Sequence, residues 1–490
     1  MIGLGLRLFR LSYKPFWQDE GVTWFIGNGI LSSDAHPGFY FFLLEKSLLY
    51  FGNNEFAGRL LSALCGSLMV LFMYYLVRFL FSHKAALLAS LFVALSPYAI
   101  AVSQEMRMYS LIGLEFVLLL IAFWHVLPAK QEFRKTFFWW LLLFAVGLAG
   151  LNTHAILNFQ LIFLSMVFVL FNWRHSPKRL VAWGITAVVW GLTYLPAFMH
   201  MASIADMRKH IWVKLLPGEI FINISFMLKS WIIMITGDLF GLYLLELKYV
   251  PLYLILPLFG SLLTLFVIAV FILIRYLKLP DDTIALQERR NVIVLLLLIA
   301  FNVLLFLSLE ISSPNHLITL FVLMVLLTVF LLMRLRYFWR TIIIAILFPV
   351  LLVSYVNYHK APNLYYDGVT WSTAGHFLTE KCNEDDIIIV FGNRNIFYTI
   401  KYYGGEIPCP MVYIKTVKWP EDPYQIAPDF ERNPFTVKLV ANYLENHPRV
   451  WCVAHERWAR KLENSSEFKI EINRFKRPAV RLMLITKADP

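Results

Sequence analysis

Long apolar runs separated by short polar loops fill the sequence up to about residue 358. A helix that crosses the hydrocarbon core of a bilayer needs about 20 consecutive, mostly apolar residues. Ten runs approach that length, and they lie at 58–80, 85–103, 109–127, 137–152, 155–173, 181–200, 251–275, 291–309, 316–333 and 341–358. The pattern therefore predicts an α-helical polytopic membrane protein with about ten spans.

The pattern changes after residue 358. Charged residues become common there, and short apolar stretches alternate with amphipathic ones. We expect helices at 371–381 and 435–446, strands at 387–391 and 449–454, and a strand-like region over 468–487. Helices that alternate with short strands indicate a small α/β domain. The sequence thus divides into a membrane domain, residues 1–358, and a second domain, residues 359–490.

Composition agrees with a membrane protein and excludes several other classes. Hydrophobic residues make up 59% of the 490 residues and charged residues only 16%, whereas a soluble domain has roughly 45–50% apolar and about 25% charged residues. Disorder and a disulfide-dense scaffold are excluded on the same grounds. The net charge of +12 does not indicate nucleic-acid binding, because many Lys and Arg residues lie in short loops between apolar runs.

These basic residues predict how the chain is oriented. They fall in every second loop, whereas the loops near 104–108, 152–154 and 310–315 contain only Arg107. Loops rich in Lys and Arg stay on the cytoplasmic side. We therefore expect residues 13–57, the 201–250 loop and the whole second domain to face outward. The basic loops carry Arg78 and Lys84; Lys130, Arg134 and Lys135; Arg174, Lys178 and Arg179; Lys278, Arg289 and Arg290; and Arg334, Arg336 and Arg340.

Two segments need a separate interpretation. Residues 218–236 are apolar but interrupted by Lys229, and a further span there would reverse the side of every later loop. We interpret them as a helix at the outer membrane interface, with Trp231 at headgroup level. Residues 1–12 are too short to span, yet 13–57 must lie outside. We therefore expect that a first span lies upstream of this start or that the chain is truncated.

The four cysteines indicate packing and, at most, one disulfide. None has metal-ligand spacing such as C-x-x-C. Cys65 lies in an apolar run and is interpreted as a packing residue. Cys382, Cys409 and Cys452 share the second domain, and two of them can form a disulfide if that domain is extracytoplasmic.

The first outward loop contains a pair of carboxylates at an apolar boundary. Asp19 and Glu20 follow Phe16 and Trp17 directly. A carboxylate beside aromatic residues at a membrane boundary suits a general base. The alternative is a solvated acidic pair next to an interfacial aromatic belt. Residues 38–51 are apolar all round and suit a helix lying on or partly in the membrane.

The second outward loop combines an acid, a base and a phenol between two spans. Arg107 can bind a phosphate, Glu105 can orient that arginine, and Tyr109 opens the next span. The alternative is a structural Glu105–Arg107 pair that tethers a short hairpin. Ionisable residues at a membrane boundary are more often functional, so we favour the phosphate site.

Other outward loops supply further candidates. His36 and His154 are candidates to line the site or contact the acceptor, although a lone histidine in a tight hairpin is more often a packing residue. Arg208 and Lys209 form a basic cluster that can meet a lipid phosphate or simply an anionic headgroup. His316, in the last outward hairpin, is a further candidate for the phosphate site. No Walker loop, G-x-G-x-x-G, H-E-x-x-H or G-x-S-x-G motif is present in the sequence.

Taken together, these loops resemble the GT-C superfamily of membrane glycosyltransferases, and most of all the protein O-mannosyltransferase and aminoarabinose-transferase type. The matching pieces, in order, are LRLFRLSYKPFWQDEG, HPGFYFFLL, QEMRMYSL, GLNTHAILNF and PNHLITLFVL. The resemblance covers roughly residues 7–355. It implies that Asp19 is the catalytic base with Glu20 as its companion, that His36 begins the helix beneath the site, and that Arg107 and Tyr109 recognise the donor. One departure stands at Asn315–His316, where the family has an arginine.

The resemblance implies a function at the outer face of the membrane. A polyprenyl-phosphate sugar would be the donor, with a lipid, glycan or protein as acceptor, and the sugar would transfer with inversion. The chemistry needs no nucleotide and no cofactor that a motif identifies, and a divalent cation is compatible with it. Two alternatives remain open: a transporter or flippase of a lipid-linked sugar, and a glycan ligase or polymerase. Outward clustering of charges and the lack of a sequence repeat favour an enzyme over a transporter.

Overall fold

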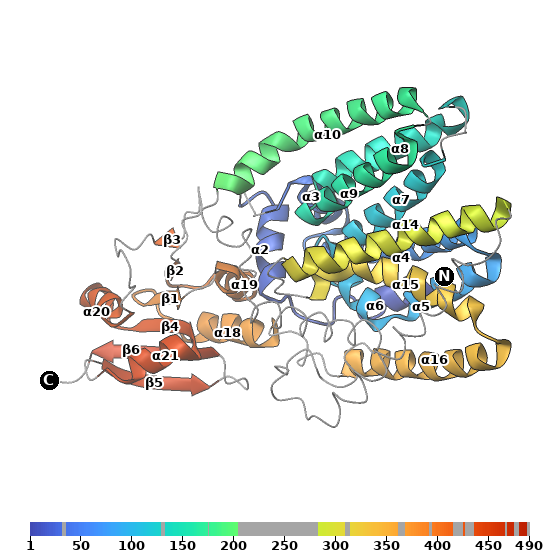
Figure 1. Ribbon diagram of the computed structural model, residues 1–490. Coiled ribbons are helices and arrows are strands. Elements are labelled where there is room, and N and C mark those ends of the chain that lie inside the picture. The colour runs from blue at the N-terminus through green and yellow to red at the C-terminus, as the bar shows by residue number, and fades with distance from the viewer. Residues whose placement is uncertain are drawn as a thin grey trace. The chain divides into compact units, whose positions relative to one another are not determined.

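The computed structural model describes most of the chain, and Figure 1 shows its helices and strands. The described residues are 1–31, 36–128, 133–174, 176–203, 283–308, 314–360, 368–391, 394–414, 425–426, 436–465, 468–474 and 480–487. The helices up to residue 360 are α1 (Ile2–Leu8), α2 (Gln18–Gly27), α3 (Phe39–Phe51), α4 (Glu55–Leu80), α5 (His83–Leu95), α6 (Pro97–Ser103), α7 (Tyr109–Val126), α8 (Phe133–Leu151), α9 (Ala155–Asn172), α10 (Pro177–Ser203), α14 (Thr283–Ser308), the 3₁₀ turn η2 (Pro314–Leu317), α15 (Ile318–Arg334) and α16 (Tyr337–Lys360).

The expected multispanning architecture is confirmed. In the described part of the chain, eight helices are long and apolar enough to cross a membrane, and the bent pair α5–α6 raises the number to nine if it counts as one span. These helices coincide with nine of the ten apolar runs. The tenth run, 251–275, lies outside the described residues, as do the segment 218–236 and the 201–250 loop beyond residue 203. The helix expected over 38–51 is present as α3.

Contacts divide the chain into two compact units that are not contiguous in sequence. Unit 1 comprises Met1–Leu11, Ala35–Leu43 and Arg59–Tyr365. Unit 2 comprises Ser12–Asp34, Leu44–Gly58 and Tyr366–Pro490. The split expected between residues 358 and 359 stays a prediction. That division did not anticipate that Ser12–Asp34 and Leu44–Gly58 belong to the same unit as the C-terminal segment.

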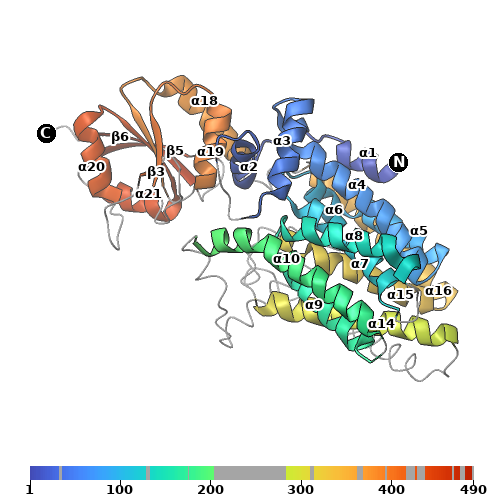
Figure 2. The same ribbon diagram turned by 90° about the horizontal axis from the view of Figure 1, so that it is seen from above.

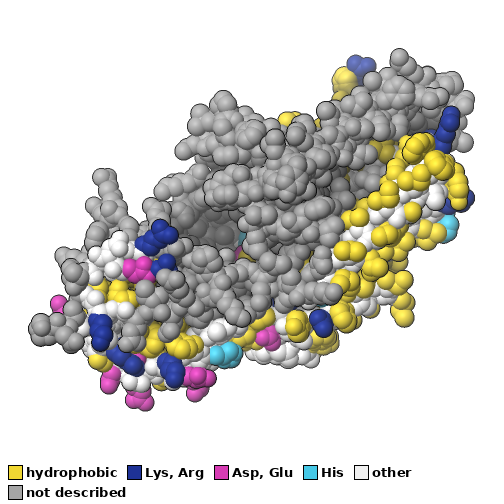
Figure 3. Space-filling view, turned by 90° about the horizontal axis from the view of Figure 1, so that it is seen from below, with side chains coloured by type: hydrophobic (Ala, Val, Ile, Leu, Met, Phe, Trp, Pro, Cys, Tyr) yellow, Lys and Arg dark blue, Asp and Glu magenta, His cyan; other side chains and the backbone are white. Residues whose placement is uncertain are grey.

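Helix α7 lies at the centre of unit 1. Almost every one of its residues is buried, and it contacts α6, α8, α9 and α15. Helices α10 and α16 instead expose large apolar side chains such as Val181, Phe338 and Trp339. Figure 3 shows hydrophobic side chains over a broad area on the side where Figure 1 draws α16. Apolar surface of this extent fits helices that face lipid.

Unit 1 contains a broken span whose backbone is completed by an arginine. Helices α5 and α6 are bent by 58° at Pro97, which has no N–H to donate to the carbonyl of Val93. The buried Arg7 of α1 supplies the missing donors. Its Nη2 lies 3.1 Å from the oxygen of Val93, its Nη1 3.4 Å from that of Ala94, and its Nε donates to Ser103. The first helix is therefore part of the core of unit 1.

Unit 2 is built on a mixed six-stranded sheet. Its elements after residue 366 are α18 (Gly368–Lys381), β1 (Ile387–Phe391), α19 (Arg394–Gly404), β2 (Met411–Ile414), β3 (Gln425–Ile426), α20 (Thr436–Asn446), β4 (Val450–His455), α21 (Glu456–Glu463), β5 (Phe468–Arg474) and β6 (Val480–Lys487). The strand order is β3-β2-β1-β4-β6-β5. Strands β1 to β4 pair in parallel, and β6 pairs antiparallel with β4 and β5. The expected small α/β region is confirmed.

Alternate residues of the central strand serve two apolar cores. Ile388 and Val390 pack with residues of α18, α19 and α2. Ile387, Ile389 and Phe391 pack on the opposite face with residues of α20 and α21. Figure 2 shows the sheet between α18 and α19 on one face and α20 and α21 on the other. Because α2 adds to the first core, the N-terminal loop segment is held by the packing of the C-terminal sheet domain.

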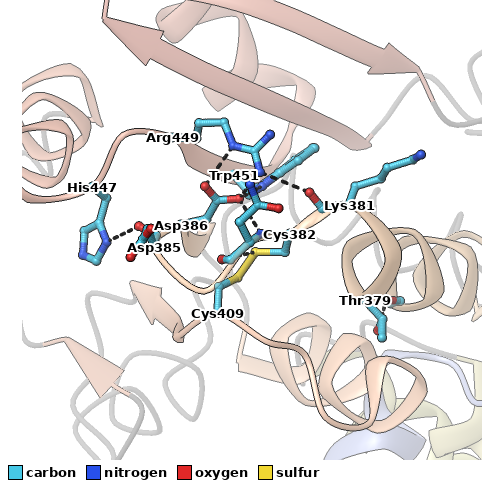
Figure 4. The surroundings of a disulfide bond; sticks show 11 residues. Thr379, Lys381, Cys382, Asp385, Asp386, Cys409, His447, Arg449 and Trp451 are labelled. Carbon is cyan, nitrogen blue, oxygen red and sulfur yellow. Dashed lines mark hydrogen bonds and ion pairs between the residues drawn. A yellow bond between two sulfur atoms is a disulfide. The ribbon is translucent and has the colours of Figure 1, made fainter.

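One disulfide and one ion pair fix the start of β1 (Figure 4). Cys382 and Cys409 form the disulfide, whereas Cys452 is a free thiol buried in β4, and Cys65 is buried as expected. The carboxylate of Asp386 is buried and accepts hydrogen bonds from Arg449 at 2.9 and 2.6 Å, from the indole of Trp451 and from the backbone of Asn383. Burial raises the pKa of Asp386, but these donors outweigh it, and the pKa lies below its ordinary value.

Candidate functional site

The polar segment 104–108 lies between the end of α6 and the start of α7, and it is buried throughout. Asn315 in η2 donates a hydrogen bond of 2.8 Å from Nδ2 to Oε2 of Glu105. The backbone carbonyl of Arg107 accepts a 3.0 Å hydrogen bond from the hydroxyl of Ser62 in α4. These bonds hold the backbone of the second loop against α4 and η2.

Three histidines from three separate segments gather around Tyr109. The Tyr109 hydroxyl lies 3.4 Å from Nε2 of His316, and the two rings meet edge to face at 5.3 Å. The ring of His154 lies 5.8 Å from that of His316 and stacks on His36 at 4.7 Å. Aromatic contacts of this kind fix ring orientation. The structure therefore brings together six residues singled out from the sequence: His36, Glu105, Arg107, Tyr109, His154 and His316. We refer to these six as the Arg107 cluster.

The electrostatics of the Arg107 cluster favour a bound anion. Burial lowers the pKa of His36 well below its ordinary value of 6.5, and the charges of Arg107 and His316 lower it further. His36 is therefore neutral near pH 7 and offers hydrogen bonds rather than charge. Nδ1 of His154 accepts the backbone N–H of Ile156 and caps α9, so the neutral ring carries its proton on Nε2. A buried guanidinium in the same cluster as imidazole and phenol groups suits phosphate oxygens.

Glu115 is a buried carboxyl group next to this cluster, and sequence analysis assigned it no role. Its Oε1 accepts a 2.8 Å hydrogen bond from Thr153, the residue before His154. Its Oε2 has no hydrogen-bond partner among the described residues. Thr153 therefore links the cap of α9 to the middle of α7.

Asp19 and Glu20 lie in unit 2, in the first turn of α2. Oδ1 of Asp19 accepts a hydrogen bond of 2.5 Å from Nδ2 of Asn395, the second residue of α19. Glu20 is buried, and its Oε2 accepts the backbone N–H of Trp17 at 3.2 Å, which caps the helix. Glu20 thereby fixes the turn that carries Asp19.

Helix α19 carries a row of polar residues that sequence reasoning missed. Asn395, Thr399 and Tyr403 follow one another at intervals of four and therefore share one face of the helix. Asn395 binds the side chain of Asp19, Thr399 donates to the carbonyl of Gln18 at 3.2 Å, and the Tyr403 hydroxyl accepts the N–H of Phe16. The four-residue spacing predicts that these residues share one helix face, but nothing in the sequence indicates which segment that face contacts.

The remaining candidates lie outside the described residues or are not tested by the geometry. Arg208 and Lys209 fall in the undescribed segment after residue 203. In the described part of the chain, no group of three or more His, Cys, Asp or Glu side chains is arranged to hold a metal ion. Asn315 was named only as a departure from the family pattern, and the structure gives it a specific partner in Glu105.

Comparison with known proteins identifies the fold. Residues 35–200, which contain every member of the Arg107 cluster except His316, match the family model for dolichyl-phosphate-mannose-protein mannosyltransferase. The crystal structure of apo ArnT from Cupriavidus metallidurans is similar, with a TM-score of 0.62 and 13% identity over 98% of this chain and 96% of that one. The same protein bound to undecaprenyl phosphate gives a TM-score of 0.57 and 13% identity over 99% and 96%.

A second solved protein has a related fold. The oligosaccharyltransferase AglB from Archaeoglobus fulgidus, in complex with an inhibitory peptide and a dolichol-phosphate, has a TM-score of 0.52 and 12% identity over 98% of this chain and 72% of that one. No curated protein sequence matches this chain. These likenesses show the GT-C fold, and with the family match they confirm the resemblance to membrane glycosyltransferases of the mannosyltransferase and ArnT type.

Proposed function

We propose that this multi-pass membrane protein transfers a sugar from a polyprenyl-phosphate donor to a hydroxyl group of a lipid, glycan or protein acceptor. The observation that carries the proposal is the Arg107 cluster, a buried guanidinium among three histidines and a tyrosine, because it suits a phosphate. Support also comes from two proteins of similar fold, which bind undecaprenyl phosphate and a dolichol-phosphate.

The chemistry follows from the charges that develop. The acceptor oxygen attacks the anomeric carbon, the bond from that carbon to the phosphate oxygen breaks, and polyprenyl phosphate leaves. Arg107 would stabilise the negative charge on the leaving phosphate, and Tyr109 and His316 would donate hydrogen bonds to the same phosphate. Asp19 would take the proton of the acceptor hydroxyl as general base. Glu20 would serve as its companion by holding the first turn of α2. In-line attack from the face opposite the phosphate inverts the anomeric carbon.

We assign unit 2 and the Arg107 cluster to the outer face of the membrane. The basic loops predict this orientation, and the Cys382–Cys409 disulfide is typical of an oxidising compartment. Cysteines introduced at exposed positions test it in intact cells with a membrane-impermeant maleimide. Asn464→Cys, after α21 in unit 2, should label directly. Arg78→Cys, at the end of α4 in a basic loop, should label only after permeabilisation. The reverse pattern would exclude this orientation.

A turnover assay tests the function. Purified full-length protein is incubated with radiolabelled polyprenyl-phosphate sugars and a panel of acceptors, and the release of free polyprenyl phosphate is measured together with transfer of label. An enzyme gives both products in equal amounts. A transporter moves the donor across liposomes without releasing polyprenyl phosphate. A ligase or polymerase extends a lipid-linked glycan instead of a simple acceptor, so the three activities are separated by their products.

A further inference from the structure

The polar row of α19 makes two different kinds of contact with the first outward loop. Thr399 and Tyr403 bind its backbone, at the carbonyl of Gln18 and the N–H of Phe16. Tyr403 also donates to Oε1 of Glu55 at 3.2 Å. Asn395 instead binds a side chain, the carboxylate of Asp19. Among the three, only Asn395 contacts the side chain of Asp19.

The helices on either side of this contact are held closely together. A Cβ atom added to Gly21 would lie 2.1 Å from Oγ1 and 2.7 Å from Cα of Thr399, so no larger residue fits between α2 and α19. The Thr399 hydroxyl also lies 2.8 Å from the carbonyl oxygen of Asn395, so its single hydrogen is shared between that carbonyl and the one of Gln18. A hydrogen bond between side chains on two helices packed this closely has little freedom to change its geometry.

We propose that Asn395 is a positioning residue for Asp19: it fixes the orientation of the carboxylate and favours its ionised form, so that the base is ready to take the acceptor proton. The proposal rests on the proposed function, in which Asp19 is the base. The amide nitrogen of Asn395 can only donate, and a donor to a carboxylate stabilises the charged form over the protonated one. Asn395 lies in the first turn of α19, where the helix dipole adds to the same effect.

The test uses variants of the full-length protein that alter this hydrogen bond in different ways. Asn395→Leu keeps the size of the side chain but removes the donor, and Asn395→Asp places a second carboxylate against Asp19. Thr399→Val and Tyr403→Phe are the matched controls, because they remove bonds from the same helix face to the loop backbone and leave the carboxylate contact. Release of polyprenyl phosphate is measured against pH, with kcat and the KM for donor taken separately.

We expect Asn395→Leu to lower kcat up to about 100-fold, with little change in donor KM. The acidic limb of the pH–rate profile should move to higher pH, because the ionised base has lost a donor. Asn395→Asp should move that limb further, since two carboxylates in contact cannot both be ionised easily. The control variants should keep the position of the limb. If Asn395→Leu does not fold, Asn395→Ser, with a hydroxyl too short to reach Asp19, replaces it.

The outcomes separate the inference from its premise. If the Asn395 variants keep the kcat and pH profile of the unmodified protein while Asp19→Asn is inactive, then Asp19 is the base and Asn395 does not position it. If Asp19→Asn is fully active, the base has been assigned wrongly and the inference is overturned with it. If the control variants move the acidic limb as far as Asn395→Leu does, the effect belongs to the whole loop and the specific role of Asn395 is excluded.

Discussion

The side-chain amide of Asn315 donates a 2.8 Å hydrogen bond to the carboxylate of Glu105, and this bond joins η2 to the loop that carries Arg107. Both residues are buried. At Asn315, part of the departure expected from the resemblance, the chain supplies a neutral donor to an acid. Glu105 thus has a structural partner whether or not it contributes to donor binding.

This contact predicts different behaviour for two substitutions of Glu105. Glu105→Leu leaves a buried amide without its acceptor and should lower the free energy of unfolding by about 1–3 kcal/mol. Glu105→Gln keeps an acceptor oxygen and should unfold close to the normal temperature. The measurement is a thermal unfolding curve in detergent. Equal midpoints for the two variants would show that the hydrogen bond contributes nothing.

Substitution of Asp19 should affect turnover rather than donor binding. Asp19→Asn keeps the shape of the side chain but removes the basic oxygen, so kcat should fall roughly 100-fold or more. Donor affinity should change little. Glu20→Gln is the matched control, because glutamine can still accept the N–H of Trp17 and cap α2. Near-normal turnover of a folded Asp19→Asn variant would direct the search for a base to Glu20 and Glu105.

Substitution of Arg107 should have the opposite effect. Arg107→Ala removes a charge-assisted contact to the phosphate, and the affinity for a radiolabelled polyprenyl phosphate should fall roughly 10- to 100-fold. Arg78→Ala serves as a control, since this exposed arginine lies at the end of α4 within a loop expected to be cytoplasmic. If both variants bind the lipid as the unmodified protein does, the Arg107 cluster is not the phosphate site.

The close approach of α2 and α19 predicts a strong effect at one glycine. Gly21→Ala places a methyl group against the backbone of Thr399 and should destabilise unit 2 by about 1–3 kcal/mol. Exposure of the buried Cys452 thiol on heating, followed with a thiol-reactive fluorophore in a Cys65→Ala background, measures this. Gly5→Ala is the matched control, because nothing lies within 4 Å of the added Cβ there. An unchanged midpoint for Gly21→Ala would contradict the packing.

Asp386 should make the stability of unit 2 depend on pH. The folded-state pKa of Asp386 lies below its ordinary value of 3.8, so as the pH falls the unfolded chain takes up the proton first. The stabilisation is therefore complete at neutral pH and is lost below about pH 4. Asp386→Asn should cost about 3 kcal/mol at neutral pH, because it removes the carboxylate that pairs with Arg449. The same variant should also make the exposure of the Cys452 thiol less dependent on pH in the acid range. If the variant keeps the normal dependence on pH, a group other than Asp386 causes it.

The sequence predicted the elements of this fold better than their contacts. Apolar length placed the spans, and a short continuous apolar run placed β1 at Ile387–Phe391, because both patterns are local. The contact between Asp19 and Asn395 joins residues 376 positions apart, and no local pattern encodes it. For the same reason the sequence allowed three disulfide pairings and did not select Cys382 with Cys409, although the position of Cys452 within a buried strand was a usable signal.

Within the candidate site, residue type predicted which side chains would gather but not what each would bind. His36, His154 and His316 were chosen separately from three loops, and the structure brings all three together. Asn315 and Ser62 were not chosen, because neutral hydrogen-bonding residues are common and become informative only when their partners are known. The orientation in the membrane stays a prediction from the alternation of basic loops, and the catalytic roles stay a prediction from the family resemblance.

The contacts of Arg7 with the broken span also bear on the order of events during synthesis. Helix α1 is synthesised before α5 and α6. Arg7 is therefore present when the bend at Pro97 enters the membrane, and it can donate at once to the carbonyls of Val93 and Ala94. A chain that lacks α1 would insert the same bend with the carbonyl groups of Val93 and Ala94 deprived of the Arg7 donors. A buried carbonyl without a donor costs about 1–3 kcal/mol, so deletion of α1 should lower the yield of inserted protein.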